Sequence, residues 1–272
     1  MISVLNSVSQ LGAENALSST QASLQNTLLE LSTGLKINSG ADDAAGLSIA
    51  AGLGANIAAL TQSSQNASNG VGLLQTADGA LSQVTSLLNQ AVTLATEASN
   101  GQLTAAQSTA ANTAYQSILT EITQIGSTTN FNGTAVFSAT PITTYTSDGT
   151  SGGTTTTSTT TGALSSTTLA LNATALTSTA AASTALTAIT AAINTVAATR
   201  GTIGASVNQL TADSSVENTE ITNLTNAQNG VQNADIGTTV AKMTQYNVLE
   251  QTGMAALSQS NQAEQAVLKL LQ

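Results

Sequence analysis

Apolar residues recur at alternating intervals of three and four along most of this chain, and this spacing restricts the fold more than any other feature. Between residues 53 and 95 the spacing is seven residues without a break, at Leu53, Leu60, Ala67, Leu74, Leu81, Leu88 and Ala95. Such alternation places one apolar stripe on a helix and is typical of helices packed in a coiled-coil-like bundle. Pro141 is the only proline, so long helices meet almost no breaker.

Three further segments carry the same alternation. The first contains Leu17, Leu24, Leu28, Leu31 and Leu35, and the second contains Ala111, Tyr115, Ile118, Ile122 and Ile125. The longest extends from Leu186 to Val231, with polar interruptions at Arg200, Ser214, Glu217 and Gln228. A helix over residues 183–232 would be roughly 75 Å long and would need partner helices. We therefore expect it to pack antiparallel to a second long helix over residues 44–99.

The middle of the chain has a different composition. Residues 138–162 contain the only proline, a Gly-Gly pair and a run of threonines. Thr favours extended structure and Asp148-Gly149 is a hairpin turn signal, so we expect a short β-hairpin or loop, with disorder as the alternative. Residues 163–182 are ambiguous between strand and helix. The predicted fold class is mainly α, with this small insertion between helices from both chain ends.

Composition excludes several function classes. The chain has no cysteine and no histidine, which removes the usual zinc ligands, the thiol nucleophile and the commonest general base. We therefore predict no catalytic, cofactor-binding or metal-binding residues. Its four bases, Lys36, Arg200, Lys242 and Lys269, are scattered within a net charge of −10, which argues against binding to nucleic acid or to an anionic membrane.

Two segments bear on localisation: the N-terminus and an uncharged segment in the middle of the chain. The first twenty residues lack a basic region and an unbroken apolar core, so we expect no secretory signal peptide. Residues 149–199 carry no charge but are rich in Ser and Thr, so we expect no transmembrane helix there.

Only 7% of residues are charged. Drift on surfaces that are mostly buried against neighbouring molecules would explain so few charges. Adaptation to an acidic medium is a sharper hypothesis, and structural integrity measured between pH 2 and pH 7 would test it.

Local signals mark the ends and irregularities of the helices. The connection at residues 36–43 separates the first helix from the second, and Ser39 or Asp42 is the expected cap of the second. Asn69-Gly70 and Asn229-Gly230 fall within helical segments, where glycine costs about 1 kcal/mol relative to Ala. They are either helix defects that permit repacking or points of close approach, and we favour close approach.

Seven motifs at the two ends of the chain resemble those of bacterial flagellins. The N-terminal half contains LSTGLKINSGADDAAGLSIA (31–50), QNASNGVGLLQTADGAL (65–81), EASNG (97–101) and TNFNG (129–133). The C-terminal half contains Arg200-Gly201, NAQNGVQNADIGTTVAKMTQYNVLEQ (226–251) and ALSQSNQAEQAVLKLLQ (256–272). The resemblance covers about residues 1–137 and 185–272 and leaves the middle unmatched.

This resemblance implies a structural subunit that self-assembles into the flagellar filament for swimming and catalyses nothing. Residues 1–36 and 236–272 would form the inner filament core, and residues 37–137 and 183–235 the outer helical bundle. Residues 138–182 would be a variable surface insertion. Implied partners are other copies of the chain, hook-associated and cap proteins, and a flagellar export chaperone. The chain would be exported to the extracellular filament without a cleaved signal peptide, and its ends would order only on polymerisation.

The expected site residues fall into four groups. Self-assembly residues are Leu24, Leu28, Leu31, Leu35, Leu257, Val267, Leu268, Leu270 and Leu271. The outer-bundle seam consists of Leu53, Leu60, Leu74, Leu81, Leu88, Ile193, Val196, Ile203 and Leu210. The surface that the innate receptor reads in related flagellins corresponds to Gln90, Leu94 and Glu97, and Gln90 replaces a family Arg, which predicts weakened recognition. O-glycosylation is expected at Thr154, Thr155, Thr156 and Ser158.

Three alternative functions fit parts of the sequence less well. A hook–filament junction protein shares the helical architecture but lacks the fuller set of flagellin motifs. A Thr-rich surface adhesin would carry repeats and an anchor, and a carboxylate-based hydrolase would need a concave pocket. The sequence favours the filament subunit over all three.

Overall fold

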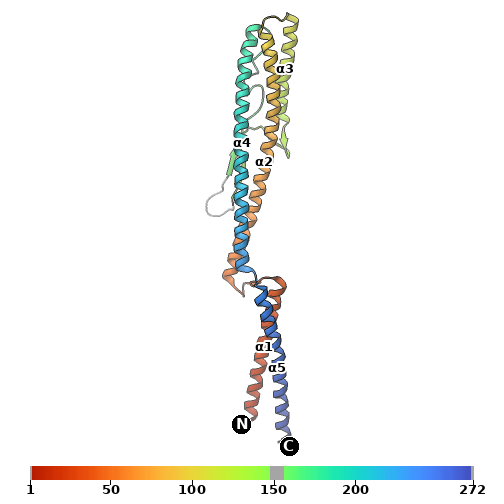
Figure 1. The fold of residues 1–272 in the computed structure, drawn as a ribbon, viewed down its shortest axis with the longest axis vertical. Coiled ribbons are helices and arrows are strands. Elements are labelled where there is room, and N and C mark those ends of the chain that lie inside the picture. Colours follow the sequence, from red (N-terminus) through yellow and green to blue (C-terminus); the bar gives the residue numbers. More distant parts are fainter. Residues whose placement is uncertain (1, 148–155, 271–272) are drawn as a thin grey trace. The chain divides into compact units, whose positions relative to one another are not determined.

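The fold is built almost entirely from helices (Figure 1). The computed structural model describes residues 2–147 and 156–270. The helices are α1 (Ile2–Thr33), α2 (Ala44–Ser99), α3 (Ala105–Thr128), α4 (Thr179–Gln232) and α5 (Ile236–Leu270). The strands are β1 (Asn130–Phe131), β2 (Thr134–Ala135), β3 (Ile142–Tyr145) and β4 (Thr156–Thr159). The predicted fold class, mainly α with a small β insertion, is confirmed.

Two compact units divide the chain. The terminal unit comprises Met1–Ala55 and Asn223–Gln272, and the central unit comprises Asn56–Thr222. Both long helices, α2 and α4, contribute residues to each unit. The predicted division into filament layers at residues 36 and 236 is a statement about the polymer and stays a prediction.

In the terminal unit, α1 and α5 run antiparallel, so that the start of α1 and the end of α5 lie together (Figure 1). Gln21 donates to the Glu250 carboxylate across the pair, at 3.1 Å from Nε2 to Oε1. Near this contact Gly253 lies so close to Leu17 that an added Cβ would be 3.3 Å from Leu17 Cδ1. The two helices therefore approach closely along a small-residue contact.

The segment that follows α1 and the segment between α4 and α5 are joined by backbone hydrogen bonds. The α1 helix ends before Gly34, which has a φ of +74°, in the left-handed region that favours glycine. The Lys36 N–H donates to the Gln232 carbonyl at 2.8 Å, and the Ala234 N–H donates to the Gly34 carbonyl at 2.9 Å. The end of α4 and the exit of α1 are thus joined into one turn.

The prediction that Ser39 or Asp42 caps the N-terminus of α2 is wrong. Asp43 is the capping residue, since its Oδ1 accepts from the N–H groups of Ala45 at 3.0 Å and Gly46 at 2.9 Å. Asp42 instead closes the preceding turn, where its Oδ2 accepts from the backbone N–H groups of Asn38 and Ser39. These bonds lower the pKa of Asp42, because hydrogen bonds to the ionised form favour it.

The core of the central unit lies between α2, α3, α4 and the irregular segment 160–178 that covers them. Buried apolar residues of α2, such as Leu74 and Leu81, belong to one cluster with Ile122 of α3 and Ile189 and Ile203 of α4. Contacts between α2 and α4 pair early residues of one helix with late residues of the other, as in Ser63–Glu217 and Asp78–Arg200. The predicted antiparallel pairing of the two long helices is therefore confirmed.

The middle of the chain forms a hairpin that packs on this core. Strands β3 and β4 pair antiparallel, with Ile142 opposite Thr159 and Tyr145 opposite Thr156. The predicted turn at Asp148-Gly149 lies outside the described residues. The sequence left residues 163–182 open between strand and helix, and in the structure residues 163–178 form neither. They are a run of turns that leads to α4, and their leucines are buried: Leu164, Leu169, Leu171 and Leu176.

Each polar interruption in the apolar stripe of α4 finds a partner on α2. In the central unit, Arg200 pairs with Asp78, Ser214 Oγ lies 2.9 Å from Ser64 Oγ, and Glu217 accepts from Ser63. In the terminal unit, Gln228 Nε2 donates to the Ala50 carbonyl at 3.1 Å. The interruptions therefore fix the register of the two helices instead of weakening their packing.

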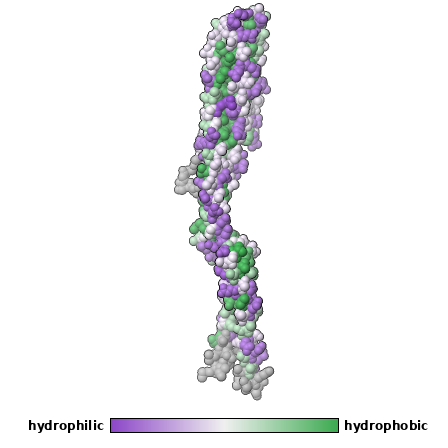
Figure 2. Space-filling view, in the orientation of Figure 1, coloured by the Kyte–Doolittle hydropathy of each residue, from purple (hydrophilic) through white to green (hydrophobic). Residues whose placement is uncertain are grey.

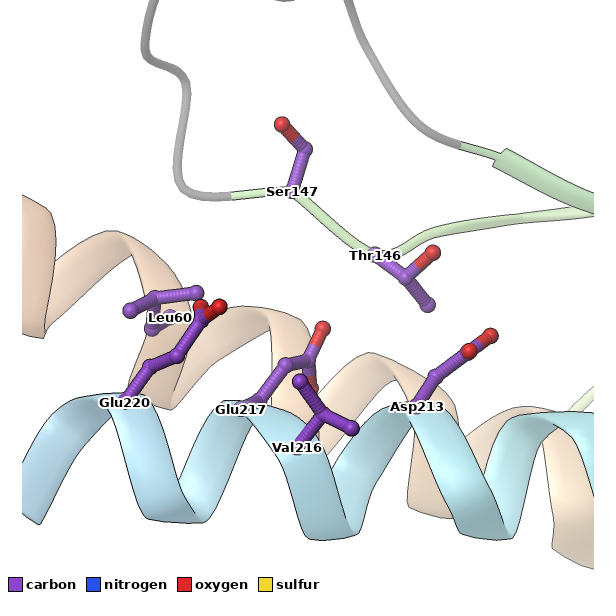
Figure 3. Close-up of a pocket in the computed structure, with 7 residues that line it drawn as sticks. All are labelled: Leu60, Thr146, Ser147, Asp213, Val216, Glu217 and Glu220. Atoms are coloured by element: carbon purple, nitrogen blue, oxygen red, sulfur yellow. The ribbon is translucent and has the colours of Figure 1, made fainter.

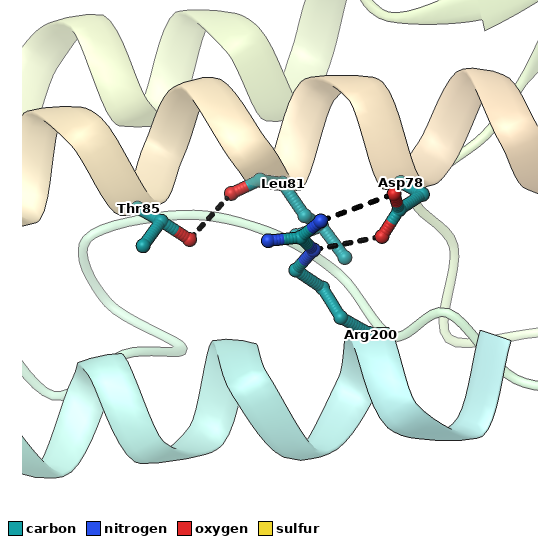
Figure 4. A network of polar contacts seen from close by, with 4 residues as sticks. All are labelled: Asp78, Leu81, Thr85 and Arg200. Atoms are coloured by element: carbon teal, nitrogen blue, oxygen red, sulfur yellow. Dashed lines mark hydrogen bonds and ion pairs between the residues drawn. The ribbon is translucent and has the colours of Figure 1, made fainter. Parts of the chain in front are cut away.

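The Asp78–Arg200 pair is bidentate (Figure 4), with Arg200 Nε 2.7 Å from Asp78 Oδ1 and Nη2 3.1 Å from Oδ2. The hydrogen bond from Arg200 lowers the pKa of Asp78. A lowered pKa contributes stability above the unfolded pKa and loses it as the pH falls through the folded pKa.

We expect Arg200→Gln to destabilise the central unit by roughly 0.5 kcal/mol at neutral pH, because both side chains are partly exposed and screened by solvent. The loss is expected to shrink in high salt and in acid, as followed by urea unfolding. A difference that persists unchanged once Asp78 is protonated would contradict this account.

Gly70 and Gly230, which lie inside the long helices α2 and α4, have different surroundings. A Cβ at Gly70 would lie 2.8 Å from Thr144 Oγ1 and 3.1 Å from Leu210 Cδ1, so Gly70 admits the hairpin and α4 against α2. The close approach favoured from the sequence is confirmed there. Gly230 has nothing within 4 Å of its Cβ position in the described part of the chain, so its role stays open.

Candidate functional site

The terminal unit carries most of the exposed apolar side chains of the molecule. Of the large apolar side chains exposed in the described part of the chain, all except Tyr145 and Val216 belong to it. They are Val8, Leu11, Leu28, Leu29, Ile49, Ile236, Val240, Val248, Leu249 and Met254. Val8 is 64% exposed and Leu28 45% exposed. Figure 2 shows apolar patches between the polar side chains of this unit. We call these ten residues the terminal apolar surface.

The same unit has almost no core of its own. Among the residues whose side chains the structure describes, Ile37 and Ala50 are its only buried apolar residues. The other buried apolar residues, from Leu60 to Leu210, lie in the central unit. Helices stabilised by packing normally bury one apolar face, and an exposed apolar surface of this extent marks an association site.

The predicted self-assembly residues lie in this unit. Leu24, Leu31, Leu35 and Leu257 are half-buried, and Leu28 is exposed. The side chains of Val267, Leu268, Leu270 and Leu271 lie outside the described part of the structure. The sequence pattern missed the exposed residues Ile236, Val240, Val248 and Leu249 of α5, because their spacing does not follow one clear stripe.

The predicted seam of the outer bundle occupies the central core, except at one end. Leu60, Leu74, Leu81, Leu88, Val196, Ile203 and Leu210 are buried there, and Ile193 packs against the same cluster half-buried. Leu53 is half-buried and belongs to the terminal unit. The seam thus makes up much of the core of the central unit.

Two predicted recognition surfaces lie on exposed parts of the central unit. Gln90 and Glu97 are exposed and Leu94 is half-buried, and their spacing puts all three on one side of α2. Thr156 and Ser158 are exposed on one face of β4, whereas the alternate residues of that strand are buried. Thr154 and Thr155 lie outside the described residues.

Metal-binding clusters and membrane-spanning helices are two further features that bear on function. Residues 2–147 and 156–270 contain no group of three or more carboxylate, imidazole or thiol side chains that could hold a metal ion. By length and composition, α2 and α4 are each apolar enough to cross a membrane. Core helices of soluble proteins share this property, and in the central unit the apolar stripes of both helices pack into the common core.

Both ends of the chain match models of one protein family. Residues 4–141 match the bacterial flagellin N-terminal helical region, and residues 186–271 match the bacterial flagellin C-terminal helical region. The chain belongs to the bacterial flagellin family. The unmatched residues 142–185 contain β3, β4, the irregular segment and the start of α4. The flagellin-like parts are therefore the rest of the helices, together with β1 and β2.

Known flagellins are similar to this one over about half of its length. A flagellin of Serratia marcescens is 40% identical over 140 residues, which are 51% of this chain and 40% of the relative. A phase 1 flagellin of Salmonella naestved is 39% identical over 133 residues, 49% of this chain and 26% of the relative. The chain thus spans less than half the length of these relatives. The crystal structure of a Bacillus cereus flagellin aligns with a TM-score of 0.49 and 29% identity, over 56% of this chain and 88% of that one.

Proposed function

We propose that this flagellin is a structural subunit that polymerises into the extracellular filament of the bacterial flagellum, for swimming, and that it catalyses no reaction. The terminal apolar surface carries the proposal, because none of the apolar side chains that the structure describes in α1 and α5 is buried. Burying a Leu or Val side chain contributes about 1.5–3 kcal/mol. Shielding this surface in a polymer would therefore contribute on the order of 10 kcal/mol before the entropy of association is subtracted.

The lattice follows from contacts between unlike surfaces. Head-to-tail contacts that do not close into a ring generate a helical polymer. In this proposal α1 and α5 of neighbouring copies form the inner layer of a tube, residues 37–137 and 183–235 form the outer layer, and residues 138–182 project from the surface. The wider partners, by family resemblance, are hook-associated proteins, cap proteins and an export chaperone.

The test is assembly of the purified full chain. We expect tubular filaments by electron microscopy above a critical concentration, because neighbouring copies then cover the terminal apolar surface. A chain that stays monomeric at every concentration, with no tendency to build tubes, would contradict the proposal.

The exposed surfaces of the central unit support two narrower proposals. Because Gln90 carries no positive charge, we expect purified monomer to activate the innate receptor for flagellin weakly, and a strong response would refute this. O-linked glycans are expected on the exposed hydroxyl groups of Thr156 and Ser158, together with Thr154 and Thr155. Intact-mass measurement of native filament tests for them.

A further inference from the structure

Glu217 of α4 is a buried carboxylate in the central unit. Only 5% of its surface is exposed. It lines a cavity of about 290 Å³ together with Leu60 of α2 and with Thr146 and Ser147, which follow β3. Figure 3 shows Asp213, Glu217 and Glu220 rising from one side of α4 toward the segment that carries Thr146 and Ser147. Glu217 therefore lies where both long helices meet the hairpin.

The Ser63 hydroxyl beside Glu217 faces two acceptors but has only one hydrogen to donate. The Ser63 hydroxyl lies 2.5 Å from Glu217 Oε1 and 3.4 Å from the Tyr145 carbonyl oxygen. A hydroxyl group has one hydrogen, so it cannot donate fully to both acceptors. Glu217 Oε2 has no hydrogen-bond partner among the described residues. While the carboxylate is ionised, the short charge-assisted bond takes the Ser63 hydrogen and the bond to Tyr145 is weak.

The surroundings of Glu217 are acidic or neutral on every side. On α4 the facing groups are Asp213 and Glu220, and the only base of the central unit, Arg200, is bound to Asp78 about 25 Å along the helix. On α2 the facing residues are Leu60 and Ser63, which do not titrate. On the hairpin side the titratable group is the exposed phenol of Tyr145, and Asp148 lies outside the described residues.

We propose that Glu217 is a proton-binding site that couples acidity to the attachment of the β3–β4 hairpin. A proton from water binds Glu217 Oε1, and the new O–H group donates to Ser63 Oγ. The Ser63 hydroxyl then turns its hydrogen to the Tyr145 carbonyl, so that each of the two contacts has its own hydrogen. A further polar contact of the hairpin, from Thr157 Oγ1 to Asp213 Oδ2 at 3.2 Å, needs no such change.

The electrostatics of the site act in the same direction. Burial raises the pKa of Glu217, the hydrogen bond from Ser63 partly opposes this, and the charges of Asp213 and Glu220 raise it further. A carboxyl whose folded pKa lies above its unfolded value contributes stability fully below the unfolded pKa and loses it as the pH rises through the folded pKa. The hairpin is therefore held more firmly in mild acid than at neutral pH, which is opposite to the usual effect of acid on carboxylates.

Hydrogen exchange of the full-length monomer tests the coupling. Protection factors of the β3 and β4 amides, corrected for the intrinsic pH dependence of exchange, are expected to rise roughly fivefold from neutral pH to mild acid, the effect of one ordinary hydrogen bond. Glu217→Gln places a donor at the same position without charge. We expect it to show the higher protection at both pH values.

Glu220→Gln is the matched control, because it removes the same charge from the same side of α4 without touching Ser63. It is expected to keep a rise in protection in acid, with the midpoint moved to lower pH because the Glu220 charge no longer raises the pKa of Glu217. Ser63→Ala, which removes the relay, is expected to abolish it, and infrared detection of the protonated Glu217 carboxyl gives an independent readout if Glu217→Gln folds poorly. Wild-type protection that does not change with pH, or pH dependence that persists in Glu217→Gln, would overturn the proposal. The assay uses monomer, so failed polymerisation has no bearing on it.

Discussion

Leu28→Asp is expected to abolish filament formation while leaving the central unit folded. Leu28 is 45% exposed in the isolated chain, and in the proposed polymer a neighbouring copy covers it. The substitution removes about 1.5–3 kcal/mol of apolar burial and forces a carboxylate out of water at a cost of several kcal/mol. Together these raise the critical concentration by about a thousandfold or more, measured by sedimentation and electron microscopy.

Asn26→Asp provides the matched control for this experiment. It adds the same charge to the same helix at an exposed polar position that faces away from Leu28. We expect it to assemble near the wild-type concentration. If Leu28→Asp also assembles there, Leu28 is not part of the contact between copies and the proposed role of the terminal apolar surface fails at this residue.

Gly126→Ala is expected to destabilise the central unit by roughly 3 kcal/mol, the upper range of overpacking effects. Gly126 lies near the end of α3, and a Cβ there would lie 1.9 Å from the Leu164 carbonyl oxygen. Backbone cannot yield as a flexible side chain does, so the segment after Gly162 has to move off the core. Urea unfolding of the monomer measures the loss.

Gly79→Ala separates this clash from the general effect of glycine. Gly79 lies within α2 with nothing within 4 Å of its Cβ position in the described part of the chain. Alanine there is expected to stabilise the helix by about 0.5–1 kcal/mol. Equal effects at the two positions would show that the Leu164 contact does not explain the need for Gly126.

Periodicity predicted the long helices well because their apolar stripes are continuous. The segment expected as residues 44–99 is α2, and α4 begins at Thr179, four residues before the expected start. The stripe could not identify the cap of α2, because three capping residues crowd into Ser39–Asp43 and only the backbone path selects Asp43. Residues 163–178 carry no period at all, since their leucines are buried by distant helices.

The candidate sites were predictable to different degrees. The seam residues Leu60, Leu74 and Leu81 could be read from one stretch of sequence, because heptad spacing alone implies burial. Glu217 could be read only as a polar interruption. Its partner Ser63 lies 154 residues away in the chain, and no local pattern links a serine to a carboxylate at that distance. The exposed residues of α5 were missed because exposure depends on which face α1 covers.

The polar contacts between α2 and α4 also have a mechanical consequence for the central unit. Asp78–Arg200, Ser64–Ser214 and Ser63–Glu217 lie at successive positions along one antiparallel pair. Sliding one helix past the other strains all three at the same moment, and a slip of one turn would strand a guanidinium and a buried carboxylate opposite aliphatic side chains. The α2–α4 pair therefore resists shear as a single element, whereas an uninterrupted aliphatic interface would let one helix slide gradually along the other.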